Sequence, residues 1–365
     1  MAVWVDSIAR RWLEDGALVR LRDTRSVVGV TSNPTIFEQA LRDGDRYAAD
    51  LARAAADGLA APAIFERLAL DDIRAAAEVL APVYAATDGR DGYVSFEVAP
   101  DLAHDTAATS AEAARLFAAI DRPNVMIKIP ATAEGLPAIR AAIAAGINVN
   151  VTLIFSIARY EAVAEAYLSG LEDRLAAGGQ LGSVASVASF FVSRVDTLLE
   201  PRLAELAAGG GPQAALASAR IGTAAIDNAK LAYAAWERIF DGPRWEALAA
   251  HGAQPQRCLW ASTSTKNPDY RDVVYCEELI GHGTVNTMPL ATLEAFADHG
   301  EVRGQCITEG RARAERLWAD LAELGIAEET VAAELEADGV KKFAASFADL
   351  LAVIAQASGE GARPA

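Results

Sequence analysis

Eight short runs of apolar and β-branched residues recur along the chain, and most are followed by a long alanine-rich segment with apolar residues at helical spacing. The runs predict strands near residues 2–6, 26–30, 92–98, 124–129, 147–151, 184–189, 257–261 and 283–287. The segments between them predict helices, for example over 156–173, 191–207 and 308–323. Strands that alternate with helices pair in parallel through right-handed crossovers. Eight such units predict an α/β fold of the (β/α)8 TIM-barrel type.

Two regions exceed a minimal barrel. Residues 35–82 predict several helices between the second and third strands, and residues 308–354 predict a helical carboxy-terminal extension. The glycine run at 209–211 is typical of a loop that ends a helix rather than of a domain linker. We therefore expect a single domain over residues 1–357, followed by a frayed, disordered tail, SGEGARPA, at 358–365.

Composition narrows the class of protein. Hydrophobic residues make up 52% of the chain, enough for a large core without metals or disulfides. The three cysteines form no CxxC pair and the four histidines show no metal-ligand spacing, so neither a disulfide framework nor a metal site is indicated. The net charge of −17 argues against nucleic acid or an anionic membrane as a partner.

The amino terminus meets charge at Asp6 and Arg10, which is unlike a signal peptide. No run approaches the roughly 20 apolar residues of a membrane span. We expect a soluble, cytoplasmic protein, either a monomer or a homodimer.

Polar side chains stand where the predicted strands end. In a barrel of this kind, functional groups lie at the carboxyl ends of the strands. These places hold Asp6, Thr31 with Asn33, Glu97, Lys128, Asn150 with Thr152, Ser189, and the segment from Ser262 to Lys266. Two carboxylates, a lysine and several amides and hydroxyls would then converge on one mouth of the barrel.

Lys128 is the most informative of these residues. In NVMIKIP its neighbours Ile127 and Ile129 lie on the other face of the strand, so Lys128 is predicted to point into the barrel. One interpretation is a buried ion pair with Glu97 or Asp6. The other is a nucleophile, which must be neutral. An ordinary lysine is neutral in only about one molecule in 2,500 at pH 7, and loss of solvation favours the neutral form.

Each of the other candidates also has a structural interpretation. Asp6 could cap the helix that follows it, and Glu97 could be a surface loop residue. Asn33 before Pro34 is typical of a turn and a helix start. Arg194 and Lys266 are candidates for binding phosphate, or they are ordinary surface cations.

The sequence resembles the transaldolases from WVDSIAR to near residue 300. Six motifs appear in family order: GVTSNPTIFEQAL at 29–41, VSFEVAPDLAHDT at 94–106, NVMIKIPATAEG at 124–135, GINVNVTLIFS at 146–156, ASFFVSRVD at 188–196 and LWASTSTKNP at 259–268. The longer form of the chain resembles the subgroup found in actinobacteria.

The resemblance implies a role for each candidate. Lys128 corresponds to the Schiff-base lysine, Glu97 to the acid/base glutamate that works through a bound water, and Asp6 to the aspartate that handles the C4 hydroxyl proton. Thr152 corresponds to a threonine that helps hold the water. The residues implied to hold substrate hydroxyls or phosphate are Thr31, Asn33, Asn150, Ser189, Arg194 and Ser262, and Lys266 replaces an arginine common in the family.

The resemblance also implies the reaction. A dihydroxyacetone unit would pass from sedoheptulose 7-phosphate to glyceraldehyde 3-phosphate, giving erythrose 4-phosphate and fructose 6-phosphate, in the non-oxidative pentose phosphate pathway and without a cofactor. Two alternatives stay open. One is a fructose-6-phosphate aldolase, which releases free dihydroxyacetone. The other is a non-catalytic barrel that binds phosphosugars.

Overall fold

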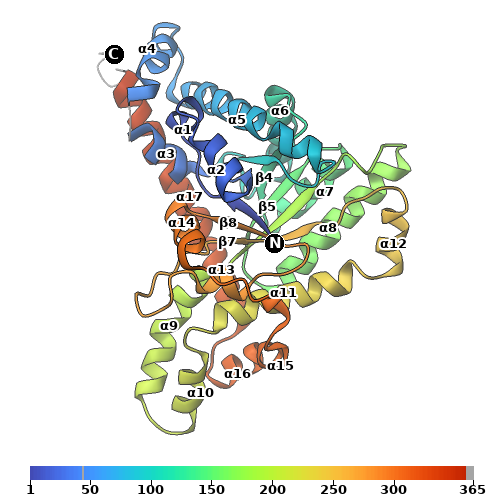
Figure 1. The fold of residues 1–365 in the computed structure, drawn as a ribbon, viewed down its shortest axis with the longest axis vertical. Helices are drawn as coiled ribbons and strands as arrows, with labels where there is room; N and C mark the ends of the chain where they lie inside the picture. Colours follow the sequence, from blue (N-terminus) through green and yellow to red (C-terminus); the bar gives the residue numbers. More distant parts are fainter. Residues whose placement is uncertain (43–44, 359–365) are drawn as a thin grey trace.

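The structure is a computed structural model that describes residues 1–42 and 45–358, and its centre is a closed barrel of eight parallel strands in chain order (Figure 1). The barrel closes where β8 pairs with β1 in parallel. This confirms the predicted (β/α)8 fold. The strands are β1 Ala2–Val5, β2 Val27–Val30, β3 Tyr93–Glu97, β4 Val125–Pro130, β5 Val149–Ile154, β6 Ser186–Phe191, β7 Arg257–Ala261 and β8 Val285–Met288.

Two strands begin later than the hydrophobic pattern predicts. The expected strands 147–151 and 184–189 are observed at Val149–Ile154 and Ser186–Phe191. The side chain of Asn148 explains the shift, because its Nδ2 donates to the carbonyl of Pro123 at 2.8 Å and its Oδ1 accepts from the backbone N–H of Ala185 at 2.9 Å. The first apolar residues of both runs therefore belong to turns that this asparagine holds.

Helices surround the barrel. They are α1 Arg10–Glu14, α2 Ala17–Arg25, α3 Pro34–Arg42, α4 Ala48–Ala56, α5 Ala61–Ala86, α6 Thr106–Ile120, α7 Gly135–Ala144, α8 Ile157–Ala176, α9 Ser193–Ala208, α10 Pro212–Arg220, α11 Ala224–Ile239, α12 Pro243–Ala249, α13 Val274–Glu278, α14 Leu290–His299, α15 Arg311–Glu315, α16 Leu317–Glu323 and α17 Glu328–Ser358. Short 3-10 turns lie at Asp45–Tyr47, Pro100–Leu102 and Cys306–Thr308.

Most of the predicted helical segments are confirmed, and one is wrong in detail. The helices expected over 156–173 and 191–207 are α8 and α9, and the glycines at 209–211 do end α9. The stretch 308–323 is not one helix, because Gly310 adopts a left-handed backbone with φ 67° immediately before α15. A 3-10 turn, α15 and α16 occupy it instead.

Both regions beyond the minimal barrel are helical, as predicted. Helices α3, α4 and most of α5 occupy 35–82, and α17 completes the carboxy-terminal extension. In Figure 1, α17 is the red helix that runs alongside α3 towards α4. It also contacts α5, α9 and β5. Of the predicted tail, Ser358 is the last residue of α17, and residues 359–365 lie outside the described residues.

Close packing at the start of the barrel fixes the first two strands. The indole of Trp4 is fully buried against Gly29 of β2. A Cβ at position 29 would lie 2.3 Å from the Trp4 ring, so only glycine leaves room for it. This contact sets β1 against β2, and Asp6 and Thr31 directly follow these two strands.

Membrane-spanning helices, metal sites and cysteine pairing each bear on the class of protein. Within residues 1–42 and 45–358, no helix has both the length and the apolar character needed to cross a bilayer. The same residues include no group of three or more histidine, cysteine or carboxylate side chains arranged to hold a metal ion. Cys258, Cys276 and Cys306 are buried free thiols.

Candidate active site

A cavity of about 370 Å³ lies at the carboxyl ends of the strands. Nine of the eleven candidate residues line it: Asp6, Thr31, Asn33, Lys128, Thr152, Ser189, Arg194, Ser262 and Lys266. The other two, Glu97 and Asn150, are bonded to side chains that do line it. The strand ends therefore bring together residues that are up to 260 positions apart in the sequence.

Lys128 and Glu97 face each other across neighbouring strands. They are register partners on β4 and β3, and the Lys128 Nζ lies 3.1 Å from Glu97 Oε2. Nζ also donates to the carbonyl of Ser32 at 3.3 Å. Each side chain is only 6% exposed, so Glu97 is not the surface loop residue that one interpretation allowed. Burial raises the pKa of Glu97, although the charge and hydrogen bond of Lys128 oppose the rise.

The ion pair does not by itself decide between a structural and a chemical role. A carboxyl whose pKa is raised can hold a proton at a pH where most glutamates are ionised. Glu97 is thus suited to take the proton of Lys128 and to return it to a bound molecule.

Asp6, which follows β1, forms a second acidic centre in the cavity, two strands away from Glu97 on β3. Its Oδ1 accepts a hydrogen bond from the Thr31 hydroxyl at 2.6 Å, and Thr31 Oγ1 lies 2.6 Å from Thr287 Oγ1. The Thr31 hydroxyl has one hydrogen and donates it to Asp6, so the Thr287 hydroxyl must be the donor in its bond with Thr31. Burial raises the pKa of Asp6, whereas Lys128, the Thr31 bond and Arg194 lower it.

Asp6 does not cap the following helix. The residue at the N-cap position of α1 is Ala9, which provides no side-chain hydrogen bond. The capping interpretation of Asp6 is therefore wrong, because Asp6 turns into the barrel mouth instead.

A buried hydrogen-bond chain orients the amide of Asn150. Ser189 donates to Asn150 Oδ1 at 2.7 Å, and Asn150 Nδ2 donates to Ser95 Oγ at 3.0 Å. These bonds assign the oxygen and nitrogen of the amide. Nδ2 carries a second hydrogen, which leaves a donor for another partner.

Two buried polar atoms of residues that line the cavity lack a protein partner. Among the described residues, neither Thr152 Oγ1 nor Arg194 Nη1 makes a hydrogen bond. Burying such groups without partners is costly, so an unpaired group at a cavity wall indicates a place for water or a ligand. Thr152 Oγ1 suits a water molecule, and Arg194 Nη1 suits an anion.

The aromatic side chains around Arg194 also favour an anion as its partner. Its guanidinium carbon lies 5.0 Å from the ring centre of Phe191 and 5.7 Å from that of Phe343. Burial lowers the pKa of Arg194, and the charges of Asp338, Glu97 and Asp6 oppose this shift. Arginine stays charged under such conditions. A half-buried cation beside two aromatic rings, with a buried donor that has no protein partner, is well suited to bind phosphate.

The loop after β7 completes the cavity wall. Ser262, Ser264 and Lys266 line the cavity, and Lys266 Nζ donates to Ser264 Oγ at 2.8 Å. Ser262 adopts φ 56°, a backbone conformation that serine visits rarely. Lys266 itself is exposed, unlike Arg194.

Asn33 keeps the structural role that its sequence context suggests. Its Oδ1 accepts from the backbone N–H of Ile36 at 3.0 Å at the start of α3. The same residue also lines the cavity. Asn33 therefore both holds the start of α3 and forms part of the cavity wall.

Comparison with known proteins identifies the family. Residues 3–354 match the family described as Transaldolase/Fructose-6-phosphate aldolase. The chain belongs to this family.

Relatives of this chain include the transaldolase of Parafrankia sp. (strain EAN1pec), which is 52% identical over 362 residues. These residues cover 99% of this chain and 96% of the relative. Transaldolase 1 of Streptomyces coelicolor is 52% identical over 97% of this chain and 91% of its own length. The transaldolase of Mycolicibacterium smegmatis is 50% identical over 96% and 93%. The predicted resemblance to actinobacterial transaldolases is confirmed.

Sequence reasoning missed one wall of the cavity in this family member. Phe343 of α17 lines it, with its ring centre 5.4 Å from Lys128 Nζ. The sequence predicts that 308–354 is helical but leaves its role open, because a helical repeat does not indicate which turn contacts a distant strand. Ser95 and Thr287 were also missed, although both lie on predicted strands, where an alternating pattern gives polar residues that point inward.

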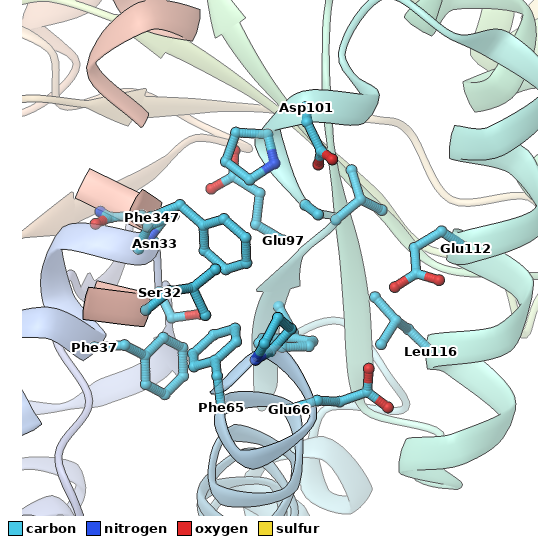
Figure 2. Close-up of a pocket in the computed structure, with 17 residues that line it drawn as sticks. Ser32, Asn33, Phe37, Phe65, Glu66, Glu97, Asp101, Glu112, Leu116 and Phe347 are labelled. Atoms are coloured by element: carbon cyan, nitrogen blue, oxygen red, sulfur yellow. The ribbon is translucent and has the colours of Figure 1, made fainter. Parts of the chain in front are cut away.

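A second cavity, of about 340 Å³, adjoins the first (Figure 2). Figure 2 shows aromatic rings on the side of this cavity that holds Asn33, and Glu66 and Glu112 on the other side. The rings labelled there are Phe37, Phe65 and Phe347, and Phe96 also lines the cavity. Glu97 therefore lies between this largely apolar space and Lys128.

Proposed function

We propose that the protein is a transaldolase that uses Lys128 as a Schiff-base nucleophile on phosphorylated ketoses. The observation that carries this function is the pair of Lys128 Nζ and Glu97 Oε2, 3.1 Å apart at the mouth of the barrel, in a site that also holds Asp6 and an unpaired Arg194 donor. A binding protein requires no such combination of an amine, two acid/base groups and a phosphate donor.

The first half of the reaction builds the Schiff base. The neutral amine of Lys128 attacks the C2 carbonyl of the ketose, and Glu97 moves a proton from nitrogen to oxygen through a bound water. Protonated Glu97 then gives a proton to the C2 hydroxyl, which leaves as water and forms the iminium. The raised pKa of Glu97 supports this role, because the acid form must be accessible near neutral pH. Thr152 Oγ1, which has no partner among the described residues, would hold the water.

The second half breaks and remakes a carbon–carbon bond. Asp6 takes the proton of the C4 hydroxyl, C4 becomes the aldehyde carbon, and the C3–C4 electron pair moves into the iminium as an enamine. The aldose phosphate leaves, and the dihydroxyacetone unit stays on Lys128. An incoming aldose phosphate is attacked by the enamine carbon, Asp6 returns the proton, and hydrolysis frees the new ketose.

The remaining residues would bind the substrate. Thr31, Asn33, Asn150 and Ser189 are suited to the hydroxyls of the dihydroxyacetone portion, and Arg194, Ser262 and Lys266 to the phosphate. The substrates proposed are sedoheptulose 7-phosphate or fructose 6-phosphate as donor, with glyceraldehyde 3-phosphate or erythrose 4-phosphate as acceptor.

Transfer is favoured over aldol cleavage with release of free dihydroxyacetone. The related proteins at 50–52% identity are transaldolases. Phe191 and Phe343 also line the site and limit the space for water beside the enamine.

Borohydride reduction in the presence of fructose 6-phosphate, followed by peptide mapping, tests the nucleophile. A stable three-carbon adduct is expected on the peptide that holds Lys128, and Lys128→Met should abolish it. Lys230 offers a matched control, since it is also 5% exposed and lies 3.1 Å from a glutamate, Glu278, but is on α11 outside the barrel. Labelling that survives Lys128→Met, or that disappears in a folded Lys230→Met variant alone, would contradict the assignment.

A further inference from the structure

The segment that carries Lys266 is irregular and is held from outside the cavity. After β7 ends at Ala261, the chain forms neither helix nor strand until α13 begins at Val274. An exposed lysine on such a segment is a mobile point charge, and its position depends on how the backbone beneath it is held. The contacts of this segment, residues 262–273, therefore bear directly on phosphate recognition.

Two carboxylates of α9 bind this segment and the helix that follows it, α13. Glu200 accepts hydrogen bonds from the Tyr270 hydroxyl and, at 3.3 Å, from Asn267 Nδ2. Asp196 accepts from the Tyr275 hydroxyl at 2.7 Å and from the backbone N–H of Ala225 at 2.8 Å. Asp196 and Glu200 are four residues apart, so they lie on the same face of the helix.

The near end is tied to the same helix. The Ser193 backbone N–H donates to the carbonyl of Ser262 at 2.9 Å, and their hydroxyls are 2.9 Å apart. Helix α9 also carries Arg194, the half-buried cation of the proposed phosphate site. One rigid element thus fixes both the arginine and the segment that presents the lysine.

The ring of Tyr270 packs closely against the backbone of Gly222. A Cβ at position 222 would lie 3.0 Å from the Tyr270 ring, and Gly222 has φ 73°, so glycine is required there on both counts. The ring and the hydroxyl of Tyr270 are therefore located by different partners, Gly222 and Glu200.

Glu200 lies on the same helix as Arg194, six residues further along the chain. Glu200 forms no ion pair with any cation in residues 1–42 or 45–358, so a surface salt bridge does not account for it. Its visible partners are the two hydrogen-bond donors of the segment.

We propose that Glu200 is a positioning residue for phosphate recognition, which acts by holding residues 262–273 so that Lys266 and Ser262 face the phosphate bound by Arg194. This role rests on the phosphate site proposed above. It predicts a specific signature: loss of a hydrogen bond to Glu200 weakens the use of phosphorylated donors but not of unphosphorylated ones.

The experiment compares fructose 6-phosphate with fructose as donors in the Tyr270→Phe and Glu200→Ala variants. For fructose 6-phosphate, KM should rise about three- to tenfold, the affinity represented by one or two ordinary hydrogen bonds, while kcat stays close to wild type. For fructose, kcat/KM should stay unchanged. Glu200→Gln keeps an acceptor for Tyr270 and should restore most of the affinity. Glu205→Ala, on an exposed position of the same helix, is the control.

Three results would overturn the role of Glu200. These are equal losses with both donors, a lowered melting temperature without any change in KM, and KM effects of Tyr270→Phe and Lys266→Met that simply multiply in the double variant. Failure of the proposed function looks different, since the wild-type protein would then show neither turnover nor a borohydride adduct with either donor.

Discussion

The ring of Phe343 lies 5.4 Å from Nζ of Lys128, although the two residues belong to opposite halves of the chain. The same ring lies 5.7 Å from the guanidinium of Arg194. One aromatic side chain of α17 thus contacts both the proposed nucleophile and the proposed phosphate ligand. The carboxy-terminal helix is therefore part of the active-site wall and does more than buttress the barrel.

Phe343→Ala should lower transferase kcat/KM about two- to thirtyfold, which corresponds to the ~0.5–2 kcal/mol of a cation–π contact. It should also raise the yield of free dihydroxyacetone, because water would reach the enamine more easily. Enzymatic assay of dihydroxyacetone, with and without an acceptor aldose phosphate, measures both effects. Phe347→Ala is the control, since Phe347 is one turn further along α17 and lines the second cavity. The same loss in both variants would show that only the stability of α17 matters.

Gly339 determines how closely α17 approaches the barrel. A Cβ there would lie 2.8 Å from Cδ2 of Leu153 and 3.4 Å from Nη1 of Arg194. Leu153 itself has φ 62° at the irregular end of β5. We expect Gly339→Ala to destabilise the protein by about 1–3 kcal/mol through overpacking, although alanine favours helix formation by ~1 kcal/mol.

Denaturant unfolding of a double-mutant cycle tests this contact. Leu153→Ala removes the side chain that the new Cβ would meet, so the double variant should lose less stability than the sum of the single variants. If the losses in the free energy of unfolding are additive, the effect of Gly339→Ala does not arise from its contact with Leu153.

The barrel and most of the site could be predicted from the sequence, for a physical reason. Parallel strands end at one mouth, so polar residues after each apolar run, such as Lys128 and Asp6, converge whatever the intervening helices do. What the pattern could not supply depends on contacts between distant elements. Phe343 and Phe347 look alike in a helical repeat, yet only Phe343 contacts Lys128. Likewise, nothing in the spacing of Glu200 and Tyr270 indicates that they bond.

Errors in the prediction have the same origin. Asp6 before a helix has the pattern of a cap, but the helix begins at Arg10, and the carboxylate bonds Thr31 across the strand boundary. The strand expected from residue 147 begins at 149, because the side chain of Asn148 ties the preceding turn to two neighbouring segments. Local patterns cannot distinguish a local hydrogen bond from a tertiary one.

The hydroxyl of Thr31 should set the acid limb of the pH–rate profile. Its hydrogen bond lowers the pKa of Asp6, which burial raises. In Thr31→Val that bond is lost, so the pKa of Asp6 rises further and a larger fraction of the aspartate is protonated at acid pH. Since Asp6 must be ionised to take the C4 hydroxyl proton, the acid limb of kcat/KM should move to higher pH.

Thr35→Val is the matched control for this profile. Thr35 also lines the cavity, but its hydroxyl bonds Ser346 Oγ of α17 at 2.8 Å. The acid limb of kcat/KM in Thr35→Val should coincide with that of the wild type. An unmoved limb in Thr31→Val, with activity retained, would exclude Asp6 as the group that titrates there.

Asp196 should give the stability of the protein a measurable pH dependence. Burial raises its pKa from the ordinary 3.8 to about 6, despite the hydrogen bonds from Tyr275 and Ala225. Between these values the folded protein retains a proton that the unfolded chain has lost, so the contribution of Asp196 to stability is fully present below about pH 4 and is lost as the pH rises through 6. The size of this change is about 3 kcal/mol, from the pKa difference.

Asp196→Asn isolates this effect from the other carboxylates, because only the difference between variant and wild type is interpreted. Asparagine cannot ionise, and its Oδ1 can accept from one of the two donors while Nδ2 donates to the Tyr275 oxygen. The free energy of unfolding of the variant, relative to wild type, should therefore rise between pH 4 and pH 7 and stay level above pH 7. A constant difference across this range, measured by urea unfolding, would mean that Asp196 is ionised throughout and that burial costs it less than its surroundings indicate.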